Sequence, residues 1–199
     1  METIGVATPH GQARVHLHPA AEARAALVLG HGAAGGIDSR DLVAATEVAL
    51  EEGFAVALVE QPYRVAGRRA PAPAKQLDAC WVAVLEHLRG GALRDLPLVV
   101  GGRSLGARVA CRTADATGAI GVLCLAFPLE PRRRTPAPSR LPELEAVPVP
   151  VLVVQGRRDP FGIPPDGVQR TVALVEGDHS LRTDLAAVGD AVRAWLRAI

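Results

Sequence analysis

The chain has 199 residues, a length that accommodates one domain with a full hydrophobic core. Its formal net charge is +1 and only 3% of its residues are aromatic, which argues against a nucleic-acid surface built on basic patches or stacked rings. The first residues lack a charged segment followed by an apolar run, and no apolar stretch is long enough to cross a bilayer. We therefore expect a cytoplasmic protein that binds neither nucleic acid nor membranes.

The three cysteines, Cys80, Cys111 and Cys124, are scattered and lie on apolar patterns. This distribution favours buried free thiols in a reducing compartment over a disulfide framework. No cysteine or histidine pair shows the spacing of metal ligands, so we expect no metal and no other cofactor.

The first third of the chain predicts three strands and one helix. Residues 13–18 alternate between apolar and polar and predict a half-exposed strand, paired with residues 4–7. Residues 25–29 and 54–59 are apolar throughout and predict buried strands. Asp38 or Ser39 is expected to cap a helix that runs through Leu50, and Gly53 to end it. Residues 60–73 are expected to form an irregular loop.

The rest of the chain predicts strands alternating with helices. An amphipathic helix is expected over 75–88, followed by a strand at 96–100, a helix from Leu105, and strands at 120–127, 149–154 and 171–175. The last helix is expected to include Leu181 on its apolar face. Residues 128–148 are rich in proline, and their run Arg132-Arg133-Arg134 is interpreted as a solvated face. With no repeat and no linker, residues 1–199 predict a single α/β domain whose mostly parallel sheet is covered on both faces.

The segment Gly102-Arg103-Ser104-Leu105-Gly106 joins a predicted strand directly to a predicted helix. Only small side chains fit beside so sharp a turn, and the turn lifts the serine hydroxyl out of the sheet edge. We interpret Ser104 as a nucleophile. The alternative is a glycine-rich turn that only packs tightly.

Four motifs fall at the carboxyl ends of predicted strands, where parallel sheets bind their ligands. They are His31-Gly32, Ser104, Asp159 and His179. A serine needs a base, for which we select His179, and the imidazolium needs an anion, for which we select Asp159, with Asp178 as the rival acid. The alternatives are that Asp159 is a turn residue and His179 a loop residue.

The glycine-rich segment 30–36 can turn several backbone N–H groups toward one point. A flexible turn is the simple alternative. A nucleotide-binding loop is the functional alternative, although neither Gly-x-Gly-x-x-Gly nor a Walker lysine is present.

The order Ser104, Asp159, His179 is that of α/β-hydrolases, and motifs along nearly the whole chain carry the resemblance. They are residues 31–35, 62–63 with 67–71, 101–108, 127–129, 155–162 and 177–180. The chain resembles minimal, dienelactone-hydrolase-like α/β-hydrolases, and within them a small family that includes testis-expressed hydrolase-like proteins and a subunit of the chromatin NSL complex. Residues 130–134 depart from the His-Pro-Pro-Gly that this family leads us to expect.

The resemblance implies an α/β-hydrolase fold without a cap domain and a serine hydrolase whose oxyanion hole uses the N–H groups of Leu105 and Ala33. The expected partner is a small-molecule acyl substrate. Because some relatives are subunits of complexes, the alternative is a non-catalytic interaction module.

Substrate binding is assigned to His31, Tyr63, Arg68, Arg69 and Arg103. The three arginines lie on loops near the predicted site, which predicts a preference for acyl groups that carry a carboxylate, or else a small-ligand binder. The alternative for Arg103 is a buried ion pair with Glu60 or another acid. Residues 128–148 and 159–171 lack the period of a lid helix, so we expect an open site that favours short acyl esters.

Overall fold

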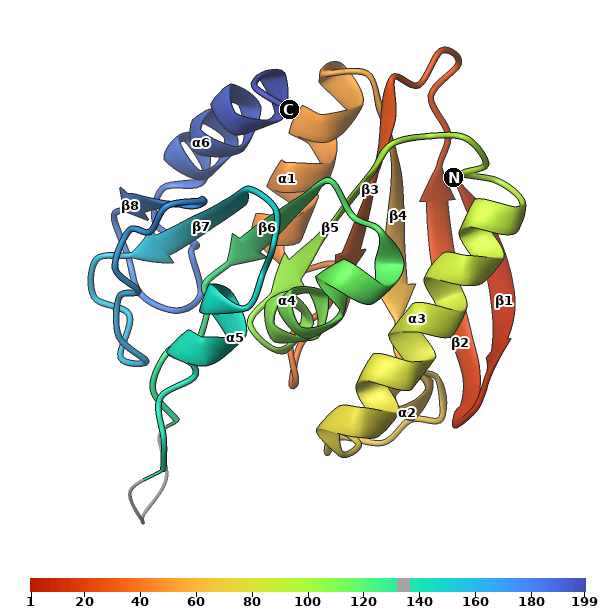
Figure 1. The fold of residues 1–199 in the computed structure, drawn as a ribbon, viewed down its shortest axis with the longest axis horizontal. Helices are drawn as coiled ribbons and strands as arrows, with labels where there is room; N and C mark the ends of the chain where they lie inside the picture. The colour runs from red at the N-terminus through yellow and green to blue at the C-terminus, as the bar shows by residue number, and fades with distance from the viewer. Residues whose placement is uncertain (132–136) are drawn as a thin grey trace.

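The structure, a computed structural model, describes residues 1–131 and 137–199, so the predicted solvated run 132–134 lies outside the described residues. The strands there form one eight-stranded sheet in the order β1-β2-β4-β3-β5-β6-β7-β8 (Figure 1). They are β1 (Glu2–Thr8), β2 (Gly11–His18), β3 (Ala25–Gly30), β4 (Phe54–Glu60), β5 (Leu98–Arg103), β6 (Gly121–Leu125), β7 (Val151–Gly156) and β8 (Arg170–Val175). β2 is antiparallel to both β1 and β4, and all other neighbours are parallel.

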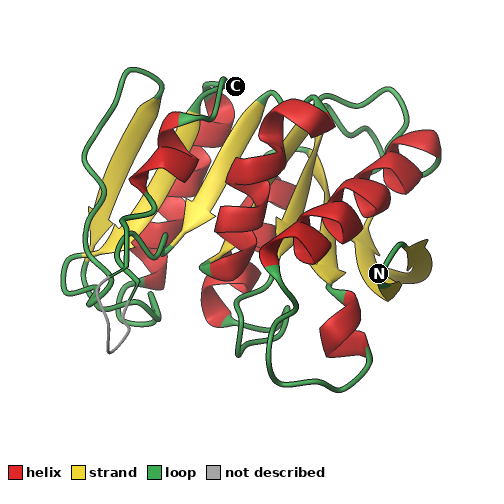
Figure 2. Cartoon of the chain, turned by 60° about the horizontal axis from the view of Figure 1, so that its bottom comes forward, coloured by secondary structure: helices red, strands yellow, loops and turns green. Residues whose placement is uncertain are grey.

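Helices cover both faces of this sheet (Figures 1 and 2). The helices are α1 (Arg40–Glu51), α2 (Pro62–Val65), α3 (Ala74–Gly90), α4 (Leu105–Thr117), α5 (Leu141–Glu145) and α6 (Leu185–Arg197). Helices α3 and α4 pack into one apolar cluster, whereas α1 and α6 pack into the other. This is the predicted α/β-hydrolase fold, with a mostly parallel sheet between two helical layers.

Strand β3 is apolar at every position because both of its faces are buried. Along β3, Ala26 and Val28 belong to the cluster under α3 and α4, while Leu27 and Leu29 belong to the cluster under α1 and α6. Successive side chains of a strand point to opposite faces, so a continuous apolar run fits a strand covered on both sides.

Two segments expected to be irregular contain short helices. Residues 60–73 include α2, where Pro62 occupies the first turn and its fixed φ favours helix initiation. Residues 128–148 include the five-residue α5, which also begins with a proline in its first turn. Such short helices have too few residues to produce an apolar period, so the sequence pattern did not indicate them. Within the described residues no cap domain covers the sheet edge.

The last helix begins at Leu185, four residues after the predicted Leu181. The Asp184 side chain accepts a hydrogen bond from the N–H of Ala187 at 3.0 Å and so caps the helix there. Leu181 is buried, but it lies in the preceding turn with a φ of 51°. Leu181 therefore fits the helical spacing of the apolar residues in α6, although it belongs to the turn before the helix.

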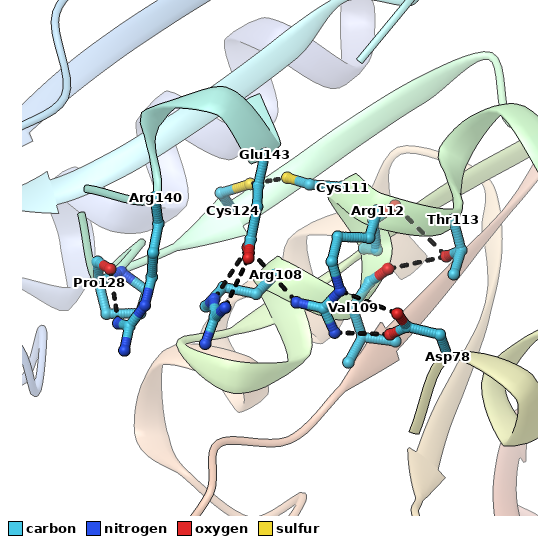
Figure 3. Close-up of polar contacts among 11 residues, drawn as sticks. Asp78, Arg108, Val109, Cys111, Arg112, Thr113, Cys124, Pro128, Arg140 and Glu143 are labelled. Carbon is cyan, nitrogen blue, oxygen red and sulfur yellow. Dashed lines mark hydrogen bonds and ion pairs between the residues drawn. The ribbon is translucent and has the colours of Figure 1, made fainter. Parts of the chain in front are cut away.

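The cysteines are buried free thiols, as expected. The Sγ atoms of Cys111 and Cys124 lie 3.5 Å apart between α4 and β6 (Figure 3). The hydrogen bond with Cys111, together with burial, holds the pKa of the Cys124 thiol well above its usual value. The Cys124 thiol is therefore not poised as a thiolate nucleophile. In the part of the chain that the structure describes, no helix is long and apolar enough to span a bilayer.

Candidate active site

Ser104 lies between the last residue of β5 and the first residue of α4, in a strained backbone conformation. Its φ of 52° and ψ of −102° lie in a region that residues with a Cβ rarely adopt. A side chain at Gly102 or at Gly106 would collide with the carbonyl oxygen of Gly30 in β3. The two glycines of the motif therefore allow α4 to lie close against the sheet, and this holds the serine at the sheet edge.

The structure brings Ser104, His179 and Asp159 together in one chain of hydrogen bonds. His179 Nε2 lies 2.9 Å from Ser104 Oγ, and His179 Nδ1 lies 2.8 Å from Asp159 Oδ2. With Asp159 as a carboxylate, Nδ1 carries the proton and Nε2 is free to accept the proton of the serine hydroxyl. Residues 75 positions apart in the sequence thus meet at the carboxyl ends of β5, β7 and β8.

The Asp159 carboxylate is completely buried and has three hydrogen-bond partners. Besides the imidazole, Oδ2 accepts from Gln155 Nε2 at 2.8 Å, and Oδ1 accepts from the N–H of Phe161 at 2.8 Å. These donors fix the orientation of the acid toward His179. Sequence reasoning missed Gln155, for which the signal is a polar residue inside the apolar strand β7, four positions before the acid.

The rival acid, Asp178, turns toward its own loop. Its Oδ1 accepts from the Ser180 hydroxyl at 2.6 Å and from the Ser180 N–H at 2.8 Å, and these bonds lower the pKa of Asp178. The structure therefore favours Asp159 as the partner of the His179 ring. The ring of Phe161, which sequence reasoning also missed, lies 4.5 Å from the His179 ring between centroids.

His31 and Tyr63, assigned to substrate binding from the sequence, make contacts that hold the glycine-rich loop. The N–H of Gln61 donates to His31 Nε2 at 3.1 Å, so Nδ1 carries the proton and donates to the carbonyl of Gly32 at 2.8 Å. Burial lowers the pKa of His31 and so favours this neutral form. The Tyr63 hydroxyl donates to the carbonyl of Ala33 at 3.1 Å, and burial raises its pKa to about 12.

The two predicted oxyanion donors, Leu105 and Ala33, belong to segments that lie next to Ser104. Leu105 is the first residue of α4, so its N–H has no acceptor within the helix. Ala33 follows Gly32, and a Cβ built on Gly32 would lie 3.8 Å from the Cβ of Ser104. Both donors therefore belong to segments that border the serine.

The predicted arginines have different environments. Arg68 and Arg69 are exposed, and Arg68 lines a cavity of about 320 Å³ together with Tyr63 and Gln76. Arg103 is mostly buried and forms an ion pair with Asp41, so the structure favours the ion-pair alternative for it. The acid is Asp41 and not Glu60, which contacts Arg14 and His16.

Among residues 1–131 and 137–199, no group of three histidine, cysteine, aspartate or glutamate side chains could hold a metal ion. The chemistry available at this edge of the sheet is that of a hydroxyl, an imidazole, a carboxylate and backbone N–H groups.

Solved structures with low sequence identity share this fold. Est1E from Butyrivibrio proteoclasticus is 14% identical, with a TM-score of 0.81, and the match covers 98% of each chain. An α/β serine hydrolase without lid from Xanthomonas campestris is 19% identical, with a TM-score of 0.77 over 99% of this chain and 94% of that one. A dienelactone hydrolase from Anabaena variabilis is 16% identical, with a TM-score of 0.75 over 99% and 96%.

A search of curated proteins finds no significant match. A protein-family model described as "Alpha/beta hydrolase domain" matches residues 23–190, which include the glycine-rich loop, Ser104, Asp159 and His179. The match covers most of the chain. The chain therefore belongs to the alpha/beta hydrolase domain family.

Proposed function

We propose that this protein is a serine hydrolase that cleaves small carboxylic esters or thioesters through an acyl-enzyme intermediate. One observation carries the proposal: Ser104 Oγ, the His179 imidazole and the buried Asp159 carboxylate form a continuous hydrogen-bonded chain. A serine hydroxyl is a weak nucleophile near neutral pH, and this arrangement supplies the base and the orienting acid that it needs.

In the first half of the reaction, Ser104 Oγ attacks the acyl carbon and its proton passes to His179 Nε2. The tetrahedral intermediate collapses when His179 returns that proton to the leaving alcohol or thiol, which leaves an acyl-serine. In the second half, water replaces the alcohol: it loses a proton to His179 and releases the carboxylic acid, and the proton returns to Ser104. Asp159 holds the imidazole in the required tautomer and stabilises the imidazolium.

The oxyanion that forms in each tetrahedral intermediate needs preorganised donors. We assign this role to the backbone N–H groups of Leu105 and Ala33. Tyr63 and His31 support the second donor, because their hydrogen bonds to the carbonyls of Ala33 and Gly32 restrain the loop that carries it.

The substrates are small, because little of the described chain is available to enclose a long one. Where the structure describes it, the connection after β6 contains one helix, the five-residue α5. The relatives support this assignment: one is described as lacking a lid, and Est1E has been solved with ferulic acid, a carboxylic acid, bound. For Arg68 and Arg69 we propose contacts with a substrate carboxylate, which the exposed guanidinium groups can bind in bidentate fashion. An Arg68→Met variant then loses kcat/KM for carboxylated esters but not for neutral ones of the same size.

The test is labelling with a fluorophosphonate probe combined with hydrolysis of p-nitrophenyl acetate. We expect the wild type to label and to turn over, and Ser104→Ala to lose labelling and to lose kcat by on the order of 10⁶-fold. Ser180→Ala is the matched control, since it removes the hydroxyl of the residue next to His179, which in the described residues donates a hydrogen bond to Asp178. A folded wild type that neither labels nor hydrolyses would favour a non-catalytic interaction module.

A further inference from the structure

Arg103, the residue before the nucleophile, contacts the loop that carries the histidine. Its Nη2 donates a hydrogen bond to the backbone carbonyl of His179 at 3.0 Å. A bond to a backbone carbonyl fixes the position of the loop itself, whereas the bonds to the imidazole ring fix only the side chain. The residue before Ser104 thus determines where the backbone of His179 lies.

The same guanidinium is held by a buried acid from α1. Arg103 Nε lies 2.9 Å from Asp41 Oδ2, and the Asp41 side chain has no exposed surface. The other carboxylate oxygen accepts a hydrogen bond from the neighbouring N–H of Leu42, at 3.0 Å. Arg103 is thus the one cationic partner that the described structure gives this acid, and a buried acid without such a partner is costly.

A third segment also lies against this arginine. A Cβ on Gly32 would come within 2.8 Å of Arg103 Nη1, so the guanidinium packs directly on the glycine-rich loop. Arg103 therefore joins the strand end that carries the nucleophile, the loop that carries the predicted oxyanion donor, and the loop that carries the base. Because Asp41 and the His179 carbonyl occupy it, the guanidinium is not available to a substrate carboxylate.

We propose that Arg103 is a positioning residue for His179, and that Asp41 both anchors Arg103 and neutralises its charge beside the base. This inference rests on the proposed function, since it assigns a role within the same reaction. Two properties follow. The backbone contact keeps Nε2 within reach of the serine, and the neutral pair prevents a bare cation from opposing formation of the imidazolium.

The charges around His179 predict how the loss of either member of the Arg103–Asp41 pair affects the imidazolium. Asp159 faces the ring, Asp178 precedes it in its own loop, and Arg103 approaches its backbone. Replacing Asp41 by asparagine leaves the arginine cation uncompensated, which disfavours formation of the imidazolium at His179. Replacing Arg103 by methionine leaves the Asp41 carboxylate uncompensated, which favours the imidazolium.

The experiment measures kcat, KM and the pH profile of kcat/KM for p-nitrophenyl acetate in four variants: Asp41→Asn, Arg103→Met, Arg103→Lys and the double variant Asp41→Asn/Arg103→Met. We expect the acidic limb of the profile to move down by roughly half a unit or more in Asp41→Asn and up in Arg103→Met. In the double variant it returns toward the wild-type position. We expect kcat to fall about 10- to 100-fold in Arg103→Met and in the double variant, with KM changed less than about threefold. Arg103→Lys restores part of kcat, because a lysine can still donate to the carbonyl.

The control is Arg112→Met, with Asp78→Asn as its partner. Arg112 is as buried as Arg103, with 17% of its side chain exposed, and it forms a bidentate pair with Asp78 far from the nucleophile (Figure 3). These variants lower the melting temperature but leave the pH profile in place. A purely structural role for Arg103 would give the same pattern as this control, and that result would overturn the inference. An inactive wild type would instead contradict the proposed function itself.

Discussion

At the scale of the residue, the site depends on a serine in an unfavourable backbone conformation. Ser104 has a φ of 52° and a ψ of −102°, and the close approach of Gly106 to Gly30 forces the turn. Strained backbones of this kind persist only where the surrounding structure imposes them. Asp159 shows the opposite case, because three donors hold its carboxylate without strain.

The strain predicts that a glycine at position 104 stabilises the protein relative to an alanine. Neither variant has a nucleophile, so both are inactive, but only glycine adopts this conformation without a Cβ clash. Ser104→Gly should therefore unfold at a higher temperature than Ser104→Ala, and its free energy of unfolding should be larger by about 1 kcal/mol. Thermal unfolding of the two proteins measures the difference, and equal stabilities would show that the turn is not strained.

The two acids beside the histidine predict different losses of activity. Asp159→Asn cannot orient the imidazole or stabilise the imidazolium, and its kcat should fall by about 10²- to 10⁴-fold. Asp178→Asn removes an acid that bonds only Ser180, and it should retain kcat within a fewfold of the wild type. Steady-state kinetics with p-nitrophenyl acetate tests both variants. A larger loss in Asp178→Asn would mean that the other acid orients the base.

At the scale of the element, ion pairs between arginines and carboxylates join helices on both faces of the sheet. On one face, Glu143 of α5 bonds Arg108 and Arg112 of α4, and Asp78 of α3 also bonds Arg112 (Figure 3). On the other face, Arg193 and Arg197 of α6 bond the glutamates at the end of α1. Arginine suits these contacts because its fork binds a carboxylate through two N–H groups.

The contact between α1 and α6 predicts a stabilisation that depends on pH. Hydrogen bonds from Arg197 and Arg193 lower the pKa of Glu52 to about 2 from an ordinary value of 4.5. A lowered carboxyl pKa means that the stabilisation is fully present above about pH 4.5 and is lost as the pH falls toward 2. Glu52→Gln should therefore lower the melting temperature at pH 7, and the deficit should shrink below pH 4.5.

The matched control for this prediction is Glu51→Gln. Glu51 bonds only Arg193, and 62% of its side chain is exposed, against 11% for Glu52. Its replacement should change the melting temperature less at every pH. Equal effects of the two substitutions, or a Glu52→Gln deficit that does not vary with pH, would contradict the assigned ion pair.

At the scale of the whole molecule, helices cover both faces of the sheet. The candidate active site therefore lies at the edge formed by the carboxyl ends of the parallel strands. In the described residues, the loops at this edge contain no helix longer than the five-residue α5, so little apolar wall is available for a long acyl chain. Burial yields about 0.8 kcal/mol per methylene only where such walls receive the chain.

The scarcity of apolar wall at this edge predicts a preference for esters of short acyl groups. Across p-nitrophenyl esters with acyl groups from two carbons upward, kcat/KM should be highest for the short acyl groups. For the longer esters, the activity should not increase when the substrate concentration exceeds the critical micelle concentration. A variant such as Gly90→Ala, which lies at the far end of α3 with open space around it, gives the reference for a neutral substitution. A steady climb into long chains would reveal a tunnel or a lid.

The sequence by itself determined the order of the strands and the long helices, and it predicted the candidate reacting groups. Continuous apolar runs indicate strands covered on both faces, and Gly102-x-Ser104-x-Gly106 between a strand and a helix indicates the turn that presents a nucleophile. These signals are local, because burial on two faces and a sharp turn each restrict the residue types of a single segment. The assignments of Asp159 and His179 needed only one further rule, that ligands bind at the carboxyl ends of parallel strands.

Only the tertiary structure decided which neighbours complete the site. From the sequence, Arg103 could bind either a substrate or a buried acid. It pairs with Asp41 because α1 packs beside β5, and no local sequence pattern indicates this packing. The start of the last helix shows the same limit, since Leu181 is buried at helical spacing yet lies in a turn. Contacts between segments far apart in the chain arise from packing in three dimensions, whereas periodicity records only whether a residue is buried and not what buries it.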